Sequence, residues 1–371
     1  MSPRSPGKPR AGSARYATPM GSTPVIDIAE APRSSALSPG AHIRQDAPPS
    51  PATICIGICT VRRPRMLERC IRSVAAQTGV DSHDVRIVVV ENDTAPACKA
   101  IVEACAAASH FPVRYIHEPR RGIPMARNRV LDAALAMNAD HVVFLDDDQV
   151  AHPTFLAKHL DAARRDGADV VQPHIVPIFP DPPPFWATGD TGVVELVETD
   201  TPLSERLRGS AGTCGVMFSA RLIRPEGMAL RFDERLALAG GEDTDFFARA
   251  RSKGAVVAWS RLPVVMDEVH RSRLTYRRYV ARGLAHGGRK FAHYRETKGF
   301  GAALRKHGPE VASRFVRGVL QLIVAPLFAP FDMRRFKFSA LEGGRNIAIA
   351  AGVLGAIFSL QYEYYRQIDG Y

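Results

Sequence analysis

Short apolar runs and amphipathic stretches alternate along the first half of the chain. Each apolar run is bounded by polar residues or proline, which is typical of a strand buried on both faces. The predicted strands are 53–60, 85–90, 113–116 and 141–145. Between them apolar residues recur at helical spacing, and the predicted helices are 66–77, 97–108 and 124–137. This alternation predicts an α/β fold with a mostly parallel, doubly wound sheet and helices on both faces.

The second half of the chain has a less regular pattern. The expected elements are a mobile proline-rich loop over 179–191, strands over 213–219 and 256–259, and helices over 242–250 and about 274–298. Residues 1–52 are rich in Ser, Pro, Ala, Gly and Arg without periodicity, so we expect them to be disordered. The chain is therefore expected to consist of this segment, an α/β domain over 53–270 and a basic helical region over 271–371.

The formal net charge of +11 is distributed unevenly along the 371 residues. Residues 270–371 hold 18 basic and 6 acidic side chains, whereas 53–269 hold 25 basic and 29 acidic. This asymmetry suggests that an anionic surface contacts one end of the molecule only. The basic third also contains two apolar segments, 319–331 and 346–360, which are shorter than the roughly 20 residues of a spanning helix. We expect interfacial or re-entrant attachment to a membrane surface, although packing inside the protein would give the same pattern.

Composition excludes several classes of protein. An apolar content of 46% is too high for a wholly disordered chain. Six cysteines without a CxxC pair exclude a disulfide scaffold and argue against a structural zinc site. The N-terminus lacks the apolar stretch of a signal peptide, so we expect a cytoplasmic protein with reduced thiols, located at the inner face of the cell membrane.

Three consecutive aspartates follow the predicted strand 141–145. Asp146 and Asp148 are two residues apart, so in an extended segment both side chains project to one side. Paired carboxylates suit a hard divalent cation that also takes phosphate oxygens, such as Mg²⁺ or Mn²⁺. A solvated acidic turn is the alternative, but ligands of doubly wound sheets bind beyond the carboxyl ends of the strands, where this triplet lies.

Two further clusters contain residue types that are used in catalysis or phosphate binding. The sequence GGEDTD at 240–245 places several acids in the first turn of a predicted helix, where they could cap the helix or act as a general base. The stretch 120–129 contains Arg120-Arg121-Gly122 and Arg127-Asn128-Arg129 at a strand-to-helix junction. Such a junction can hold phosphates, although we expect at least one of Arg127 and Arg129 to be an ordinary solvent-facing residue.

The order of these motifs resembles the family 2 glycosyltransferases, whose nucleotide-sugar-binding domain has the GT-A fold. The motifs are Thr60-x-Arg62, VVVENDT, RRGIPMARN, FLDDD and GGEDTDFF, and the match spans about residues 53–295. Within the family the chain is most similar to the bacterial exopolysaccharide branch that includes succinoglycan glucosyltransferases. The family's QxxRW motif of processive polymerases is missing, so transfer of one sugar to a defined acceptor fits better than synthesis of a long polymer.

The resemblance implies a role for each matching residue. Thr60, Arg62 and Glu91 would line the nucleoside pocket, and Arg127 and Asn128 would lie near the nucleotide. Asp146 and Asp148 would be the metal-binding DxD pair, Asp146 contacting the donor as well, and Asp243 would be the base that deprotonates the acceptor. His270 could touch the metal or the diphosphate, or be a surface residue.

These expectations together describe an inverting, metal-dependent hexosyltransferase. Its partners would be a nucleotide-sugar donor, most simply a UDP-sugar, a saccharide or lipid-linked acceptor, and a membrane surface. A catalytically inactive nucleotide-binding adaptor on the same fold is the first alternative. A nucleic-acid-binding protein is the second; it would suit the sequence pI of about 9.6, but it would not explain the Asp triplet, and we expect no nucleic-acid partner.

Overall fold

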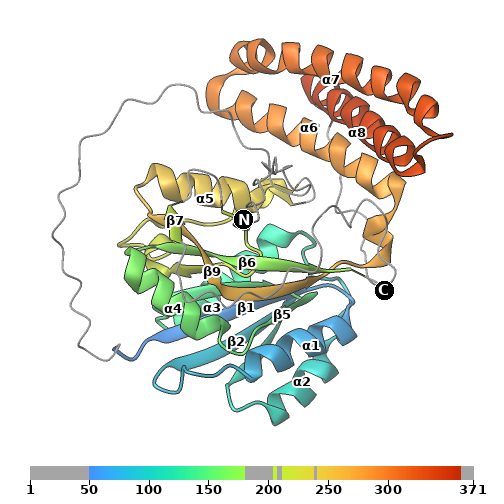
Figure 1. Cartoon of the computed structure of the whole chain (residues 1–371). Coiled ribbons are helices and arrows are strands. Elements are labelled where there is room, and N and C mark those ends of the chain that lie inside the picture. Colours follow the sequence, from blue (N-terminus) through green and yellow to red (C-terminus); the bar gives the residue numbers. More distant parts are fainter. Residues whose placement is uncertain (1–49, 180–203, 207–210, 238–239, 361–371) are drawn as a thin grey trace, which may run out of the picture.

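The structure is a computed structural model that describes residues 50–179, 204–206, 211–237 and 240–360 (Figure 1). The segment predicted to be disordered lies almost wholly outside the described residues, as does the proline-rich loop from residue 180 onward. The described chain forms an α/β unit with a layer of three long helices beside it (Figure 1).

All seven elements predicted for the first half are present, with ends shifted by at most two residues. They are β1 (Thr53–Thr60), α1 (Pro64–Ala75), β2 (Asp84–Glu91), α2 (Lys99–Ala108), β3 (Val113–His117), α3 (Ile123–Ala136) and β4 (His141–Asp146). In this half β1 is hydrogen-bonded between β2 and β4, and β2 also pairs with β3; all these pairings are parallel. The carboxyl ends of β1, β2 and β4 therefore lie together at one edge of the sheet.

The second half makes the sheet mixed. Its elements are β5 (Gln149–Ala151), α4 (Phe155–Asp166), β6 (Val170–Ile178), β7 (Ser204–Arg206), β8 (Met217–Ser219), η1 (Ala220–Leu222), η2 (Glu234–Leu236), α5 (Glu242–Ser252), β9 (Val257–Glu268) and η3 (Arg271–Leu274). The sheet order is β3-β2-β1-β4-β8-β6-β9-β5, with β7 beside β9. β8 runs antiparallel to β4 and β6, whereas β6 and β9 are parallel. Compared with the prediction, β8 is shorter and β9 is longer.

Alternation along β1 divides the core between the two faces of the sheet. Ile54, Ile56 and Ile58 face the cluster that includes α1, α2 and α4. Cys55 and Cys59 face the other cluster, which includes α3 and α5. All these helices bury an apolar stripe against the sheet, which gives the layered arrangement expected of an α/β fold.

Three long helices follow η3. They are α6 (Tyr276–Lys298), α7 (Phe300–Phe328) and α8 (Met333–Ile357). Glycines let α6 and α8 approach closely, because a Cβ at Gly287 would lie 2.1 Å from the carbonyl oxygen of Ile349, and one at Gly352 would lie 2.0 Å from that of Leu284. Within the apolar segment 346–360, most of residues 346–356 are buried by neighbouring helices, whereas Leu354, Phe358 and Leu360 are exposed. Residues 346–356 therefore mostly pack inside the protein, which was the alternative to membrane contact.

Glu310 of α7 is the polar centre of this helical layer. Its carboxylate accepts hydrogen bonds from Lys290 at 2.9 Å and from Arg314 at 3.0 Å, and it contacts the ring nitrogen Nδ1 of His307 at 3.0 Å. Partial burial opposes ionisation, but these hydrogen bonds outweigh it and lower the pKa of Glu310 to about 2. The carboxylate is therefore ionised in the folded protein over the whole physiological range.

Candidate active site

The carboxyl ends of β1, β2 and β4 bring the predicted site residues to one edge of the sheet. Thr60 is in register with Glu91 across β1 and β2, and Cys59 is in register with Asp146 across β1 and β4. The N-terminal turn of α5 and the segment after β9 close this edge from the other side (Figure 1). Residues separated by more than 200 positions in the sequence thus share one site.

The middle aspartate of the triplet is structural. Asp147 is buried, and its carboxylate accepts hydrogen bonds from Thr60 Oγ1 at 2.7 Å and from Arg63 Nη1 at 2.8 Å. Burial raises the pKa of Asp147 to about 6, against the opposing charge of Arg63. The Thr60 hydroxyl, assigned to the nucleoside pocket by resemblance, is used here to hold the triplet to β1.

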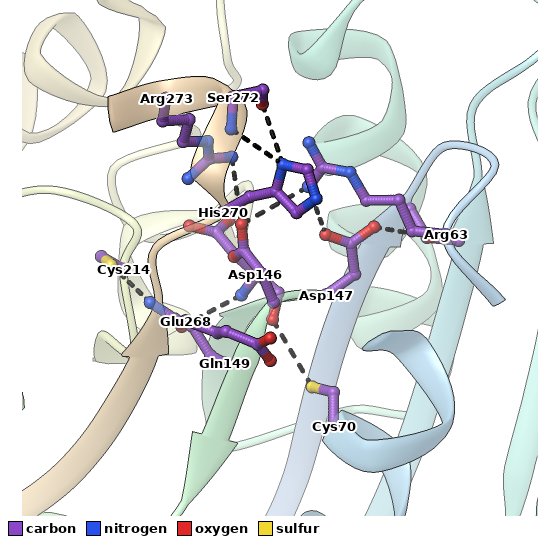
Figure 2. Close-up of polar contacts among 12 residues, drawn as sticks. Arg63, Cys70, Asp146, Asp147, Gln149, Cys214, Glu268, His270, Ser272 and Arg273 are labelled. Atoms are coloured by element: carbon purple, nitrogen blue, oxygen red, sulfur yellow. Dashed lines mark hydrogen bonds and ion pairs between the residues drawn. The ribbon is translucent and has the colours of Figure 1, made fainter. Parts of the chain in front are cut away.

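The outer two aspartates have different surroundings. Asp148 is buried and forms ion pairs with Arg273 at 3.0 Å and Arg63 at 3.4 Å. Figure 2 shows Arg63 and Arg273 approaching the cluster from different elements, the α1 side and η3. The Asp146 side chain is 41% exposed and lies 3.8 Å from Arg127. Partial burial raises the pKa of Asp146, and the negative charges of Asp148 and Asp243 raise it further, although Arg127 and Arg273 oppose them.

This pair of carboxylates fits a hard divalent cation that takes its other oxygens from a bound ligand. Across the described ranges, no three or more His, Cys, Asp or Glu side chains converge into a ready-made metal cage. Arg273 and Arg63 both pair with Asp148, so a cation bound there would compete with two guanidinium groups for this carboxylate. Asp267 of β9 lies nearby; burial and the charges of Asp148 and Asp146 raise its pKa to about 7.

Arg127 connects the Asp triplet with α5. Its guanidinium is buried, forms an ion pair with Glu242 and lies 5.7 Å from the centre of the Phe232 ring. Burial opposes the charge of Arg127, but the carboxylates of Glu242 and Asp146 outweigh it and raise the pKa of the guanidinium. The GGEDTD motif therefore supplies a buried partner for Arg127, in addition to the predicted base.

Asp243 lies beside Glu242 in the first turn of α5. It is half-buried, and its Oδ1 accepts a hydrogen bond from the backbone N–H of Thr244 at 2.6 Å. Its other oxygen is 3.3 Å from the position that a Cβ would take at Gly212, so a side chain at 212 would crowd this carboxylate. Asp243 is thus a partly open carboxylate that shares the site with Asp146.

The structure places the acid Glu91 away from the open part of the site. Glu91 is fully buried, and its carboxylate accepts hydrogen bonds from the backbone N–H groups of Ala97 and Cys98 and from the Tyr115 hydroxyl at 2.7 Å. It therefore caps the start of α2. In the sequence, an acid that caps a helix looks the same as an acid that binds a ligand, because both follow directly after a strand.

Two residues further on, Asp93 is an acid that the sequence reasoning missed. It is buried and forms an ion pair with Arg62, whose Nη2 lies 3.2 Å from Asp93 Oδ1. Arg62 has a φ of +52°, a left-handed backbone conformation that turns the chain after β1. Burial opposes ionisation, but hydrogen bonding to Arg62 lowers the pKa of Asp93. The sequence signal for Asp93 is the second acid of ENDT, which follows the same strand as Glu91.

The remaining motif residues have mainly positioning roles. The side-chain amide of Asn128 donates to the Phe232 carbonyl at 3.0 Å and accepts from the Phe232 N–H at 2.9 Å, which fixes that loop. Arg129 is 44% exposed, as expected for one of the two arginines of its motif. The ring nitrogen Nδ1 of His270 accepts a hydrogen bond from the backbone N–H of Ser272 at 3.2 Å. His270 therefore caps η3, the short helix that carries Arg273 (Figure 2).

Known proteins resemble this chain over most of its length. A family model described as Glycosyl transferase family 2 matches residues 55–222. The succinoglycan biosynthesis protein ExoM of Rhizobium meliloti (strain 1021) is 30% identical over 309 residues, covering 81% of this chain and 93% of ExoM.

Solved structures with a similar fold include TarS of S. aureus. TarS 1-349 in complex with UDP is 15% identical with a TM-score of 0.46, and the match covers 86% of this chain and 95% of that one. A longer TarS chain gives the same TM-score and identity, with 81% of this chain and 55% of that chain covered. From the family model and the similarity to ExoM, we conclude that this chain belongs to glycosyl transferase family 2 and is a glycosyltransferase.

Proposed function

We propose that this glycosyltransferase moves one sugar from a UDP-sugar to a saccharide acceptor, which is lipid-linked, during synthesis of an exopolysaccharide, with inversion at the anomeric carbon. The proposal is supported most directly by one observation: Asp146 and Asp243 are partly open carboxylates close to buried Arg127, at the edge where parallel strands end. The name of ExoM supports the exopolysaccharide pathway.

In this proposal Asp146 and Asp148 hold a divalent cation, Mg²⁺ or Mn²⁺. The cation supplies positive charge against the diphosphate leaving group. Arg273, which pairs with Asp148, would supply positive charge beside the same phosphates, and the Arg62–Asp93 pair would border the nucleoside. In this proposal Thr60 and Glu91 do not contact the nucleoside themselves. They support the wall of the nucleoside pocket, Thr60 through Asp147 and Glu91 through the start of α2.

Asp243 is proposed as the base. It takes the proton of the acceptor hydroxyl while that oxygen forms a bond to the anomeric carbon and the bond from this carbon to the diphosphate oxygen breaks. A single displacement with one base inverts the anomeric centre. Arg127 and Glu242 hold the first turn of α5 against the triplet, so they set the distance between the base and the donor.

Substitution of the base tests the proposal. Asp243→Asn should abolish transfer while leaving UDP affinity nearly unchanged, because the lost group acts only on the acceptor proton. Asp245→Asn is the matched control, since Asp245 lies in the same turn but forms an ion pair with Arg249 at 2.6 Å. Substantial transfer by a correctly folded Asp243→Asn protein would refute the role. Nucleotide binding without transfer in the wild type, with any acceptor, would instead favour an inactive adaptor.

A further inference from the structure

An apolar surface covers the second half of α7 and the turn after it. Nine of the large exposed apolar side chains among the described residues lie between positions 315 and 333. We define the outer face of α7 as Phe315, Val316, Leu320, Ile323, Leu327 and Phe331, which are 52% to 90% exposed. A contiguous apolar surface of this kind on a soluble unit marks an interaction site.

The opposite side of α7 is already occupied. Ala303, His307, Gly318 and Ala325 are buried, and a Cβ at Gly318 would lie 2.8 Å from the Gly343 carbonyl of α8. α7 is therefore fixed to the protein along one side and carries its apolar residues on the other. An asymmetric helix of this kind is suited to lie along a surface.

Basic residues flank the outer face at both ends. Arg305 and Lys306 precede it and are exposed, and Arg334, Arg335 and Lys337 follow it in the first turns of α8. Asp332 caps α8 and pairs with Arg335 at 3.3 Å. An apolar strip bordered by cations is complementary to a surface with an apolar interior and anionic head groups.

The dimensions favour a helix that lies in the interface. α7 is the one helix, among residues that the structure describes, that is long and apolar enough to cross a membrane by length and composition. The mainly apolar stretch from Phe315 to Leu327 contains Arg317 and extends only about 18 Å, against roughly 30 Å for a hydrocarbon core. The first half of α7 carries Arg305, Lys306 and Glu310, which a spanning helix would have to bury.

A groove of about 550 Å³ opens beside this face. Val316, Leu320, Val324 and Phe328 contribute apolar walls, and Arg317 lies at its side. An acyl chain would cover the apolar walls of the groove while its phosphate pairs with Arg317. A polar protein surface would leave the apolar walls in contact with water.

The position of the face relative to the site gives it a function. The turn between α7 and α8 lies at the end of the helical layer where α6 begins (Figure 1), and the Tyr276 hydroxyl at the start of α6 packs beside Gly344 in the middle of α8. α6 follows η3, whose Arg273 reaches Asp148. We propose that the outer face of α7 docks on an anionic phospholipid bilayer and holds the site near the membrane. Its use for a lipid-linked acceptor rests on the proposed function, whereas the docking itself does not.

Vesicle flotation of the full chain tests this proposal. Wild-type protein should float with phosphatidylcholine vesicles that contain phosphatidylglycerol, and more weakly with phosphatidylcholine alone. Ile323→Asp with Leu327→Asp should lower the partition coefficient by roughly tenfold or more, because two apolar side chains no longer enter the bilayer. Leu304→Asp is the matched control, since Leu304 is 44% exposed on the same helix but outside the outer face.

The basic flank gives an independent readout. Substituting Arg334, Arg335 and Lys337 by Gln should weaken binding to anionic vesicles by roughly fivefold per charge at low salt and should have little effect with neutral vesicles. The proposal is overturned if the wild type does not bind anionic vesicles. It is also overturned if the Asp variant binds as well as Leu304→Asp, or if light scattering shows that the face joins two copies of the chain. Transfer to a water-soluble acceptor should be unchanged in the Asp variant, so failure of docking and failure of the proposed activity give different results.

Discussion

Replacing Gly287 by alanine tests how closely α6 and α8 are packed. A Cβ at this position would lie 2.1 Å from the carbonyl oxygen of Ile349, and this atom is backbone, so it cannot rotate away as a side chain could. Ordinary contact begins at 3.4 Å, so the two helices would have to separate locally by about 1.3 Å. The substitution should therefore push α6 and α8 apart at their contact within the helical layer.

The expected magnitude follows from two opposing effects. Overpacking of a tight contact costs about 1–3 kcal/mol. Alanine gains about 0.5–1 kcal/mol over glycine within a helix, which offsets part of this cost. We therefore expect Gly287→Ala to lower the free energy of unfolding by up to about 2.5 kcal/mol. Gly301→Ala is the matched control on α7, where nothing lies within 4 Å of the added Cβ, and it should be neutral or slightly stabilising.

Urea denaturation followed by far-ultraviolet circular dichroism measures both variants. The two substitutions add the same methyl group to a helix, so a difference in sign can come only from the surroundings of the glycine. A Gly287→Ala protein that is as stable as Gly301→Ala would show that α6 and α8 do not pack as described. The close approach of these helices would then have to be abandoned.

Three further substitutions test individual contacts. Arg127→Met should destabilise the protein by about 3–5 kcal/mol by leaving Glu242 buried without its partner, and adding Glu242→Gln should restore most of this loss in urea unfolding. Thr60→Val should cost about 1–3 kcal/mol by removing a hydrogen bond to buried Asp147, and equal unfolding midpoints would contradict the contact. Because the folded-state pKa of Glu310 is about 2 and its ordinary value is 4.5, its stabilising contribution is complete above about pH 4.5 and is lost as the pH falls toward 2. Glu310→Gln should flatten this part of the stability profile, and an unchanged profile would refute the assignment.

The first half of the fold could be predicted because strand and helix patterns there are local. Each strand is a short apolar run, and each helix has a clear apolar stripe. β6 was missed because two prolines, Pro173 and Pro177, interrupt its pattern. The strand accommodates Pro173 through a shift of register between Gln172 and His174, whereas Pro177 lies opposite Asp267 without a shift. Such an adjustment depends on neighbouring strands and leaves no local signal.

The site was predicted in outline but not in its contacts. The Asp triplet was found because it follows a buried strand, yet the partners of Asp148 come from the start of α1 and from η3, far apart in the sequence. The cap formed by Glu91 depends on where α2 begins, which spacing alone does not specify. The surroundings of segment 346–360 could not be predicted either. A helix buried by protein and a helix buried by lipid have the same apolar composition.

The dependence of UDP binding on Mn²⁺ tests the central claim most directly. Calorimetry should show that wild-type protein binds UDP more tightly with Mn²⁺ than with chelator, and that Asp148→Asn, folded by circular dichroism, loses this enhancement. Asp161→Asn, a substitution of an exposed aspartate on α4, should keep it. Equal metal enhancement in Asp148→Asn and the wild type would contradict the assignment of the metal to the triplet.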